Sequence, residues 1–312
     1  MAQAVQEERN AGAWAGTRKA ARHAFLRAVW AAGHNLWQVL HAYVYGRWTY
    51  AYIGAAIGEL RHRARQRLLL APFLARALSP RRWAAEYHGK VISTAQARRL
   101  VQVKEAVALA VPERVLPFAE ARDLVLDHPE HIVALDCPCR LAREHPCLPL
   151  DVCLVIGEPF ASFVLSHHAD HARAVTPEEA VGILEAEAGR GHVHHAFFKE
   201  AMAGRFYAVC NCCSCCCGAI SAHRRGTPML VSSGYVAEID GTLCAACGIC
   251  AARCPFGALR MRDGRAEVDL AACMGCGVCV QSCPSGALAL RREPARGDPL
   301  EMSALIAGAL EM

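Results

Sequence analysis

The pattern of apolar and polar positions divides the chain into three differently built parts. Residues 1–90 are dominated by Ala, Leu and Arg, and segments such as TRKAARHAFLRAVW are amphipathic, which favours helices. The run VYGRWTYAYIG contains Gly46 and Gly54 and predicts a break or kink in a helix. Residues 91–230 alternate between helix and strand signals, and residues 231–290 contain an internal repeat.

Within the middle part, short apolar runs indicate strands that lead into cysteines. The runs HIVALD, VCLVIG, HVHHAFF and RFYAVC predict four strands, and PFAEARDLVLDHP predicts a helix from about Pro117 to Leu126. A second helix begins at Thr176, an N-cap followed by Pro177 and by Glu179 at the capping-box position, and ends near residues 189–191.

We therefore expect an α+β chain with four regions. These are a basic helical N-terminal region (1–90), an α/β cysteine-rich domain (91–230), a C-terminal two-cluster ferredoxin-like domain (231–290) and a hinge with a short helix (291–312). The last domain follows from cysteine spacing.

The repeat is formed by CAACGICAARCPFGAL and CMGCGVCVQSCPSGAL, offset by 29 residues. Each copy has the spacing C-x2-C-x2-C-x3-C-P, in which three close thiolates surround one [4Fe–4S] cluster and the fourth binds the other cluster. The expected ligands are Cys244, Cys247, Cys250 and Cys283 for cluster I, and Cys273, Cys276, Cys279 and Cys254 for cluster II. Zinc ribbons would need more widely separated pairs and would not require the C-P ending.

On these motifs, residues 239–290 resemble a bacterial two-cluster ferredoxin domain. The resemblance implies two [4Fe–4S] clusters and one-electron transfer.

Ten further cysteines lie in the middle part, after the strand-like runs HIVALD and RFYAVC: Cys137, Cys139, Cys147, Cys153, Cys210, Cys212, Cys213, Cys215, Cys216 and Cys217. If the two strands are neighbours, these residues meet at one end of a sheet. Six cysteines within eight positions exceed one tetrahedral zinc shell, and adjacent cysteines form strained disulfides. We favour a third iron–sulfur cluster, held by Cys212/Cys215 or Cys213/Cys216 with Cys137 and Cys139, or a larger cluster. Zinc and a reactive dithiol are the alternatives.

A wider resemblance covers roughly residues 115–290. The segments CPCR at 137–140, GHVH at 191–194 and NCCSCCCG at 211–218, followed by the repeat, resemble a group of uncharacterised 4Fe–4S binding proteins of anaerobic bacteria and archaea. The resemblance implies iron–sulfur binding and electron transfer, and it supplies no substrate.

Charge and cysteine content suggest where the chain works. Residues 1–90 hold 14 Lys and Arg against 4 Asp and Glu, and all five tryptophans lie there. Such a region suits peripheral contact with an anionic membrane or an acidic partner, or is a solvated helical face. No nucleic-acid module accompanies the charge, so we expect no nucleic-acid partner. The first residues lack an apolar signal core, so we expect reduced thiols and a cytoplasmic location.

Several other side chains are candidates for chemistry. Arg140 is either a counter-charge for a thiolate-bound cluster or a surface arginine. The histidine groups His167, His168 and His171, and His192, His194 and His195, are expected to be mainly structural. His168 and His195 are the candidate proton donors if a substrate is reduced.

The leading hypothesis is a relay that passes single electrons through two [4Fe–4S] clusters, with a third centre, to a partner oxidoreductase. No G-x-G-x-x-G at a strand–helix turn and no P-loop is found, so a separate flavoprotein or other redox protein is expected to supply two-electron chemistry. The alternatives are a reductase whose cysteine-rich domain carries the active cluster or dithiol, and a redox sensor.

Overall fold

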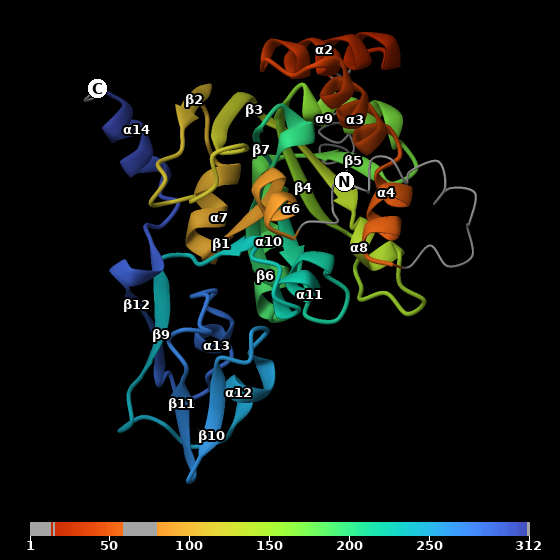
Figure 1. The fold of residues 1–312 in the computed structure, drawn as a ribbon. Helices are drawn as coiled ribbons and strands as arrows, with labels where there is room; N and C mark the ends of the chain where they lie inside the picture. The colour runs from red at the N-terminus through yellow and green to blue at the C-terminus, as the bar shows by residue number, and fades with distance from the viewer. Residues whose placement is uncertain (1–13, 15, 59–79, 311–312) are drawn as a thin grey trace.

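The computed structural model describes residues 14, 16–58 and 80–310 of the 312-residue chain. Helices and strands occur in mixed order, as expected for the α+β class (Figure 1). No helix among these residues is long and apolar enough to cross a membrane.

An eight-stranded sheet forms the centre of the larger part of the molecule. Along the sheet the order is β2-β3-β4-β7-β6-β1-β8, and β5 pairs with β3. The strands are β1 (Tyr87–Ile92), β2 (Val107–Ala110), β3 (Asp123–Asp136), β4 (Asp151–Glu158), β5 (Ala172–Val175), β6 (Val193–Lys199), β7 (Arg205–Cys212) and β8 (Leu230–Val231). Most pairings are antiparallel, and β1 runs parallel to β8.

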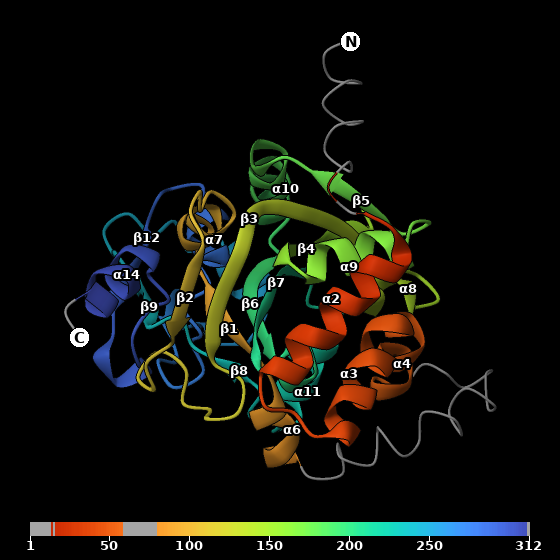
Figure 2. The same ribbon diagram turned by 90° about the horizontal axis from the view of Figure 1, so that it is seen from above.

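Helices cover both faces of this sheet (Figure 2). On one face lie α2 (Arg18–Ala31), α3 (Leu36–Arg47), α4 (Thr49–Ala56) and α9 (Phe160–His167); on the other lie α7 (Thr94–Val101), α10 (Pro177–Gly189) and α14 (Met302–Leu310). Phe25 and Phe163 belong to the core of the first face, and Leu100 and Leu184 to that of the second. The described N-terminal helices thus share a core with the cysteine-rich part.

Strand β6 shows how the sequence supplies both cores. Its side chains alternate between the faces of the sheet. Val193 and Phe197 enter the first core, whereas Ala196 and Phe198 enter the second. All of its residues are buried, because both faces of the strand are covered. This explains why the run HVHHAFF does not alternate between apolar and exposed polar residues.

The remaining helices of this part are short. They are α6 (Pro80–Glu86), α8 (Pro138–Leu141), η3 (Glu200–Met202) and α11 (Gly218–Arg224). Both α8 and α11 begin directly after a cysteine, Cys137 and Cys217 respectively, which act as their N-cap residues.

The repeat forms a smaller unit below the main sheet in Figure 1. Strand β9 (Tyr235–Ile239) pairs with β12 (Leu288–Arg292), and β10 (Leu259–Arg262) pairs with β11 (Arg265–Val268). Each copy contributes one short helix, α12 (Ile249–Arg253) or α13 (Val278–Gln281). The hinge contains η4 (Pro294–Arg296), and α14 then packs against α7 and β2, forming the expected C-terminal helix.

Most sequence expectations for single elements are confirmed. Three of the four predicted strands lie within β3, β4 and β7, and the run HVHHAFF coincides with β6 except for His192, which precedes the strand. Helix α10 begins as expected, with the Thr176 Oγ1 accepting a hydrogen bond from the Glu179 N–H at 3.2 Å. The helix break falls at Trp48, between α3 and α4, whereas Gly54 lies inside α4 without a break.

The helix predicted from Pro117 to Leu126 is wrong. Strand β3 begins at Asp123, where the exposed Asp123 is followed by the buried Leu124 and Leu126 on alternating positions. Pairing of these residues with β2 satisfies their backbone groups and buries one face, which overrides a weak helical propensity. The helicity expected for residues 1–13 and 59–79 lies outside the described residues.

Candidate metal centres and the adjoining cavity

The repeat encloses two separate cavities, each lined by four cysteines. Cys244, Cys247, Cys250 and Cys283 line the first cavity; Cys254, Cys273, Cys276 and Cys279 line the second. These are the two ligand sets expected from the spacing, including the exchange of the fourth cysteine between copies.

The backbone around the second cavity suits a thiolate-bound cluster. The Ala258 N–H donates to the Cys254 Sγ at 3.2 Å, and the Ala237 N–H donates to the Cys273 Sγ at 3.4 Å. Gly275 has φ +63°, and a Cβ there would lie 2.2 Å from the Tyr235 carbonyl oxygen. A larger residue at 275 would therefore push the cysteine loop away from β9.

The two cavities differ in exposure. Cys247 in the first loop is exposed, whereas Cys273 and Cys279 in the second are buried. Burial raises the pKa of Cys279 to about 12, so holding it as a thiolate requires a bound cation that displaces its proton.

The buried second loop packs against the main sheet unit. The Ser233 Oγ donates to the Gly275 carbonyl at 2.8 Å, and the Arg224 Nε donates to the Pro255 carbonyl at 3.0 Å. Val278 belongs to the same apolar core as Ile220 of α11. The second cavity is therefore the one that adjoins the cysteine-rich part.

The ten other cysteines converge at one end of the main sheet. Strand β4 lies between β3 and β7 and pairs its own Cys153 with Cys210. Strands β3 and β7, which contain the runs HIVALD and RFYAVC, are thus joined through β4 at this end of the sheet. Their thiols form two groups. The inner group is Cys137, Cys139, Cys153, Cys210, Cys212 and Cys217, and the outer group is Cys147, Cys213, Cys215 and Cys216.

The inner group is a row of neighbouring thiols that shift one another's pKa. Its order is Cys210, Cys153, Cys137, Cys139, Cys217 and Cys212. The contact with the Cys139 thiol, followed by burial, raises the pKa of Cys137 to about 12. Among the described residues, no three of these six sulfurs lie mutually close enough to hold a single ion.

The outer group is more compact. The sulfurs of Cys147, Cys213 and Cys215 all lie within 4.8 Å of one another, and the Cys216 Sγ lies 3.5 Å from the Cys215 Sγ. Each of the consecutive pairs Cys212–Cys213 and Cys216–Cys217 has one thiol in the inner group and one in the outer group. This division explains the doubled cysteines, and it differs from the expected sets, in which Cys212/Cys215 or Cys213/Cys216 joined Cys137 and Cys139.

Arg140 is fully buried beside the outer group and is not a surface arginine. Its Nη2 donates to the Glu187 carboxylate at 2.6 Å and to the Asn211 carbonyl at 3.1 Å. Burial acts to raise the pKa of Cys213, but the backbone N–H of Cys216, the Cys215 thiol and the Arg140 guanidinium outweigh it and lower that pKa. Arg140 therefore places positive charge where outer-group thiolates would form.

Two polar side chains, the half-buried His192 and the buried Asn211, fix the cysteine loops. The His192 Nδ1 lies 2.6 Å from the Glu187 carboxylate, and its Nε2 lies 3.7 Å from the Cys147 Sγ. The Asn211 amide donates to the Val152 carbonyl at 2.7 Å and accepts from the His194 Nδ1. These bonds hold the end of β7 against β4.

Within the described part of the chain, the candidate residues His167, His168, His171 and His195 belong to no group close enough to hold a metal ion. The His168 Nε2 donates to the Gly46 carbonyl at 2.7 Å, and His171 pairs with Asp136. The His167 Nδ1 bonds the Phe163 carbonyl at 3.0 Å. Burial lowers the pKa of His195 to about 3, so this imidazole is neutral at pH 7 and is a poor proton donor.

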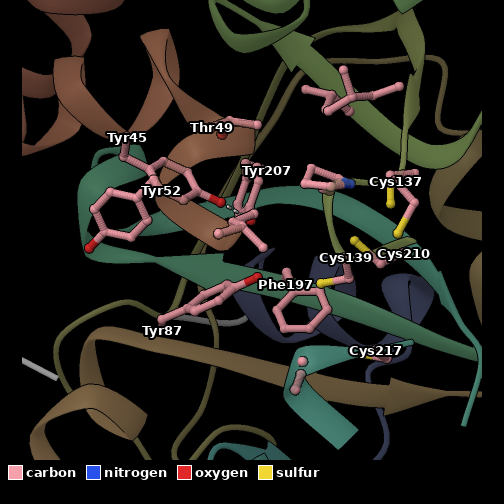
Figure 3. Close-up of a pocket in the computed structure, with 18 of the residues that line it drawn as sticks. Tyr45, Thr49, Tyr52, Tyr87, Cys137, Cys139, Phe197, Tyr207, Cys210 and Cys217 are labelled. Atoms are coloured by element: carbon pink, nitrogen blue, oxygen red, sulfur yellow. Dashed lines mark hydrogen bonds between the residues drawn. The ribbon is translucent and has the colours of Figure 1, made fainter. Parts of the chain in front are cut away.

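A cavity of about 100 Å³ adjoins the inner group. Figure 3 shows cysteine sulfurs on one side of it and Tyr45, Tyr52, Tyr87 and Tyr207 on another. The hydroxyls of Tyr45 and Tyr207 are hydrogen-bonded at 2.9 Å, and the Tyr87 phenol lies near both. Burial raises the pKa of all three phenols. Sequence reasoning missed these tyrosines because they come from distant elements, α3, β1 and β7.

Comparison with protein families agrees with the cysteine spacing. Residues 237–284 match the model of the 4Fe-4S dicluster domain. No curated protein matches the chain. The protein thus contains a 4Fe–4S dicluster domain at its C-terminal end, which supports iron–sulfur binding and electron transfer.

Proposed function

We propose that this protein carries single electrons from a redox partner, through the two clusters of the dicluster domain, to a third iron–sulfur centre held by the inner group. A [4Fe–4S] cluster supplies reversible one-electron chemistry when bound. The residues of the chain position these centres, exclude water from them and compensate their charge.

Helix α11 is the observation that carries the proposal. It begins after Cys217 of the inner group. At its other end, Arg224 bonds the Pro255 carbonyl and His223 packs edge-on against Phe256, with ring centroids 5.9 Å apart. Pro255 and Phe256 both line the second cysteine cavity. Seven helical residues span roughly 10 Å, so a single short helix separates the two centres.

The inner group suits a polynuclear cluster. Its six thiols line one cavity, with sulfurs on the side opposite the tyrosines (Figure 3). A [4Fe–4S] cube uses four thiolates, so six are sufficient for one cube or for a larger cluster. Single-ion binding does not suit sulfurs spread along a row.

The outer group suits zinc. Tetrahedral Zn²⁺ binds four thiolates at about 2.3 Å and requires their sulfurs close together. The outer group provides three mutually close sulfurs, of Cys147, Cys213 and Cys215, and Cys216 beside Cys215 as the fourth; Arg140 offsets the negative charge of a four-thiolate site. Zinc here would hold the loops 137–153 and 210–217 together while the inner group carries the electrons.

The exposed first loop of the dicluster domain is the proposed entry for electrons. Cys247 is exposed there, together with Leu243 and Ile249, which offer apolar surface to a partner. A flavoprotein or another oxidoreductase would dock at this end. The second loop is buried toward the inner group and is the internal end of the relay.

Replacing Cys276 tests the relay. Cys276→Ser should remove the second cluster, about four irons, and abolish the fast reduction of the inner centre by a donor protein. The inner centre itself should remain, since Cys276 is not one of its ligands. Freeze-quench electron paramagnetic resonance (EPR) on anaerobic protein measures both the rate and the final amplitude of its signal.

Ser282→Ala is the matched control for Cys276→Ser. Ser282 follows α13, and its Oγ donates to the Val278 carbonyl at 2.7 Å without lining the cluster cavity. This variant should keep the fast phase. A fast phase that also survives Cys276→Ser would show that electrons reach the inner centre by another route.

A further inference from the structure

We propose that the cavity beside the inner group is a substrate site. It binds a small, uncharged, largely apolar molecule with a carbonyl oxygen, and the hydroxyls of Tyr45, Tyr87 and Tyr207 receive that oxygen. The reduction of this molecule rests on the proposed function, whereas its binding does not.

The size and lining of the cavity define the kind of molecule. Its volume of about 100 Å³ is several times the roughly 10–15 Å³ that one water needs. Phe163, Phe197 and Met229 contribute apolar wall, and the phenols contribute the polar groups. A few converging polar groups in an apolar pocket are typical of a site that orients a small ligand.

The three phenols leave hydroxyl hydrogen for a ligand. Each hydroxyl carries one hydrogen. The Tyr45–Tyr207 bond uses one of the three. A further hydroxyl hydrogen is therefore available to an acceptor in the cavity, and an oxygen of a neutral carbonyl is such an acceptor.

A buried cation stands behind the phenols. The Lys199 Nζ lies 4.5 Å from the ring centroid of Tyr45 and 4.4 Å from that of Tyr87. Lys199 is buried, so its charge is weakly screened, and it also faces the buried Glu200 carboxylate, whose pKa it lowers. A positive charge at this place stabilises negative charge that develops on an oxygen bound to the phenols.

The opposite wall fixes the orientation of the bound molecule. In Figure 3 the Tyr87 hydroxyl points toward Cys139 of the inner group. A carbonyl whose oxygen rests on the phenols therefore turns its carbon toward the cysteines. That carbon is the atom that gains electron density when a carbonyl is reduced.

The reaction class is the two-electron, two-proton reduction of a carbonyl to an alcohol. Two electrons come one at a time from a low-potential one-electron donor protein through the dicluster domain. One of the phenols Tyr45, Tyr87 and Tyr207 gives one proton to the oxygen, and water gives the second proton to the carbon. Water also restores the proton of the phenol, so one C–H and one O–H bond form as the C=O double bond becomes single.

Benzaldehyde and toluene form a matched pair of probes, because they differ mainly in the carbonyl. We expect benzaldehyde to bind the anaerobically purified, metal-containing protein more tightly than toluene in isothermal titration calorimetry. Tyr207→Phe keeps the ring and removes the hydroxyl that is bonded to Tyr45. It should weaken benzaldehyde binding about fivefold, the worth of a typical hydrogen bond, and leave toluene binding unchanged.

Tyr43→Phe is the control. Tyr43 lies on α3, as Tyr45 does, but it does not line the cavity. This variant should leave the affinities for both probes unchanged. Equal binding of the two probes to the native protein, or equal losses for Tyr207→Phe and Tyr43→Phe, would overturn the proposed site.

EPR of the same samples separates the two proposals. Benzaldehyde should alter the signal of the inner centre in the native protein and not in Tyr207→Phe. A third-centre signal without any benzaldehyde binding would overturn the substrate site and leave the relay standing. Carbonyl-selective binding without a third-centre signal would support the binding site and contradict the relay.

Discussion

The double variant Cys212→Ser/Cys217→Ser should lose the third iron–sulfur centre and keep its zinc. Both thiols belong to the inner group, in which they contact each other, and neither belongs to the outer group. We expect the iron content to fall by about four per chain, the load of one cube, while the EPR signals of the dicluster domain persist.

The matched variant Cys213→Ser/Cys216→Ser changes the adjacent residue of each pair. It should show the reverse pattern, with zinc lost and the third EPR signal retained. The backbone neighbourhood is almost the same in the two variants, so general damage to the loop would affect both alike. Loss of both metals in both variants would contradict two separate centres.

Arg140→Gln should lower the stability of the protein by about 3 kcal/mol, because it breaks a buried ion pair and leaves the buried Glu187 carboxylate with only the half-exposed Arg190 and His192 as partners. Both Arg140 and Glu187 are buried, and the bond between them is 2.6 Å long. For a chain of this size the apparent Tm should fall by roughly 6–9 °C in scanning calorimetry. The double variant Arg140→Gln/Glu187→Gln should recover much of this loss, since no unpaired charge remains.

Arg190 provides the control for that prediction. Its Nη1 lies 3.0 Å from the other carboxylate oxygen of Glu187, but the side chain is 45% exposed. An exposed pair contributes about 0–1 kcal/mol, so Arg190→Gln should shift the apparent Tm little. An equal shift for Arg140→Gln and Arg190→Gln would show that burial of the Arg140 pair does not stabilise the fold.

The local elements were largely predictable because each depends on a short pattern. The capping residues of α10 and the apolar runs of β4 and β6 act within a few positions. The segment 117–126 was mispredicted because its structure depends on pairing with β2, which a local pattern does not contain.

The cysteines of the repeat were grouped by spacing alone, since the motif itself encodes which thiols share a cavity. The grouping of the other ten was not predictable in this way. It depends on β4 lying between β3 and β7, and on β7 ending at Cys212, so that Cys213 already belongs to the following loop. The meeting of Tyr45, Tyr87 and Tyr207 depends on how α3, β1 and β7 are placed relative to one another, which no single sequence motif encodes.

Iron, acid-labile sulfide and zinc per chain, measured on protein purified without oxygen, test the proposed set of centres most directly. We predict about twelve or more iron, an equal amount of sulfide and one zinc, the load of two cubes, a third cluster and a tetrahedral four-thiolate site. About eight iron would confine the clusters to the repeat and contradict an iron–sulfur centre at the inner group.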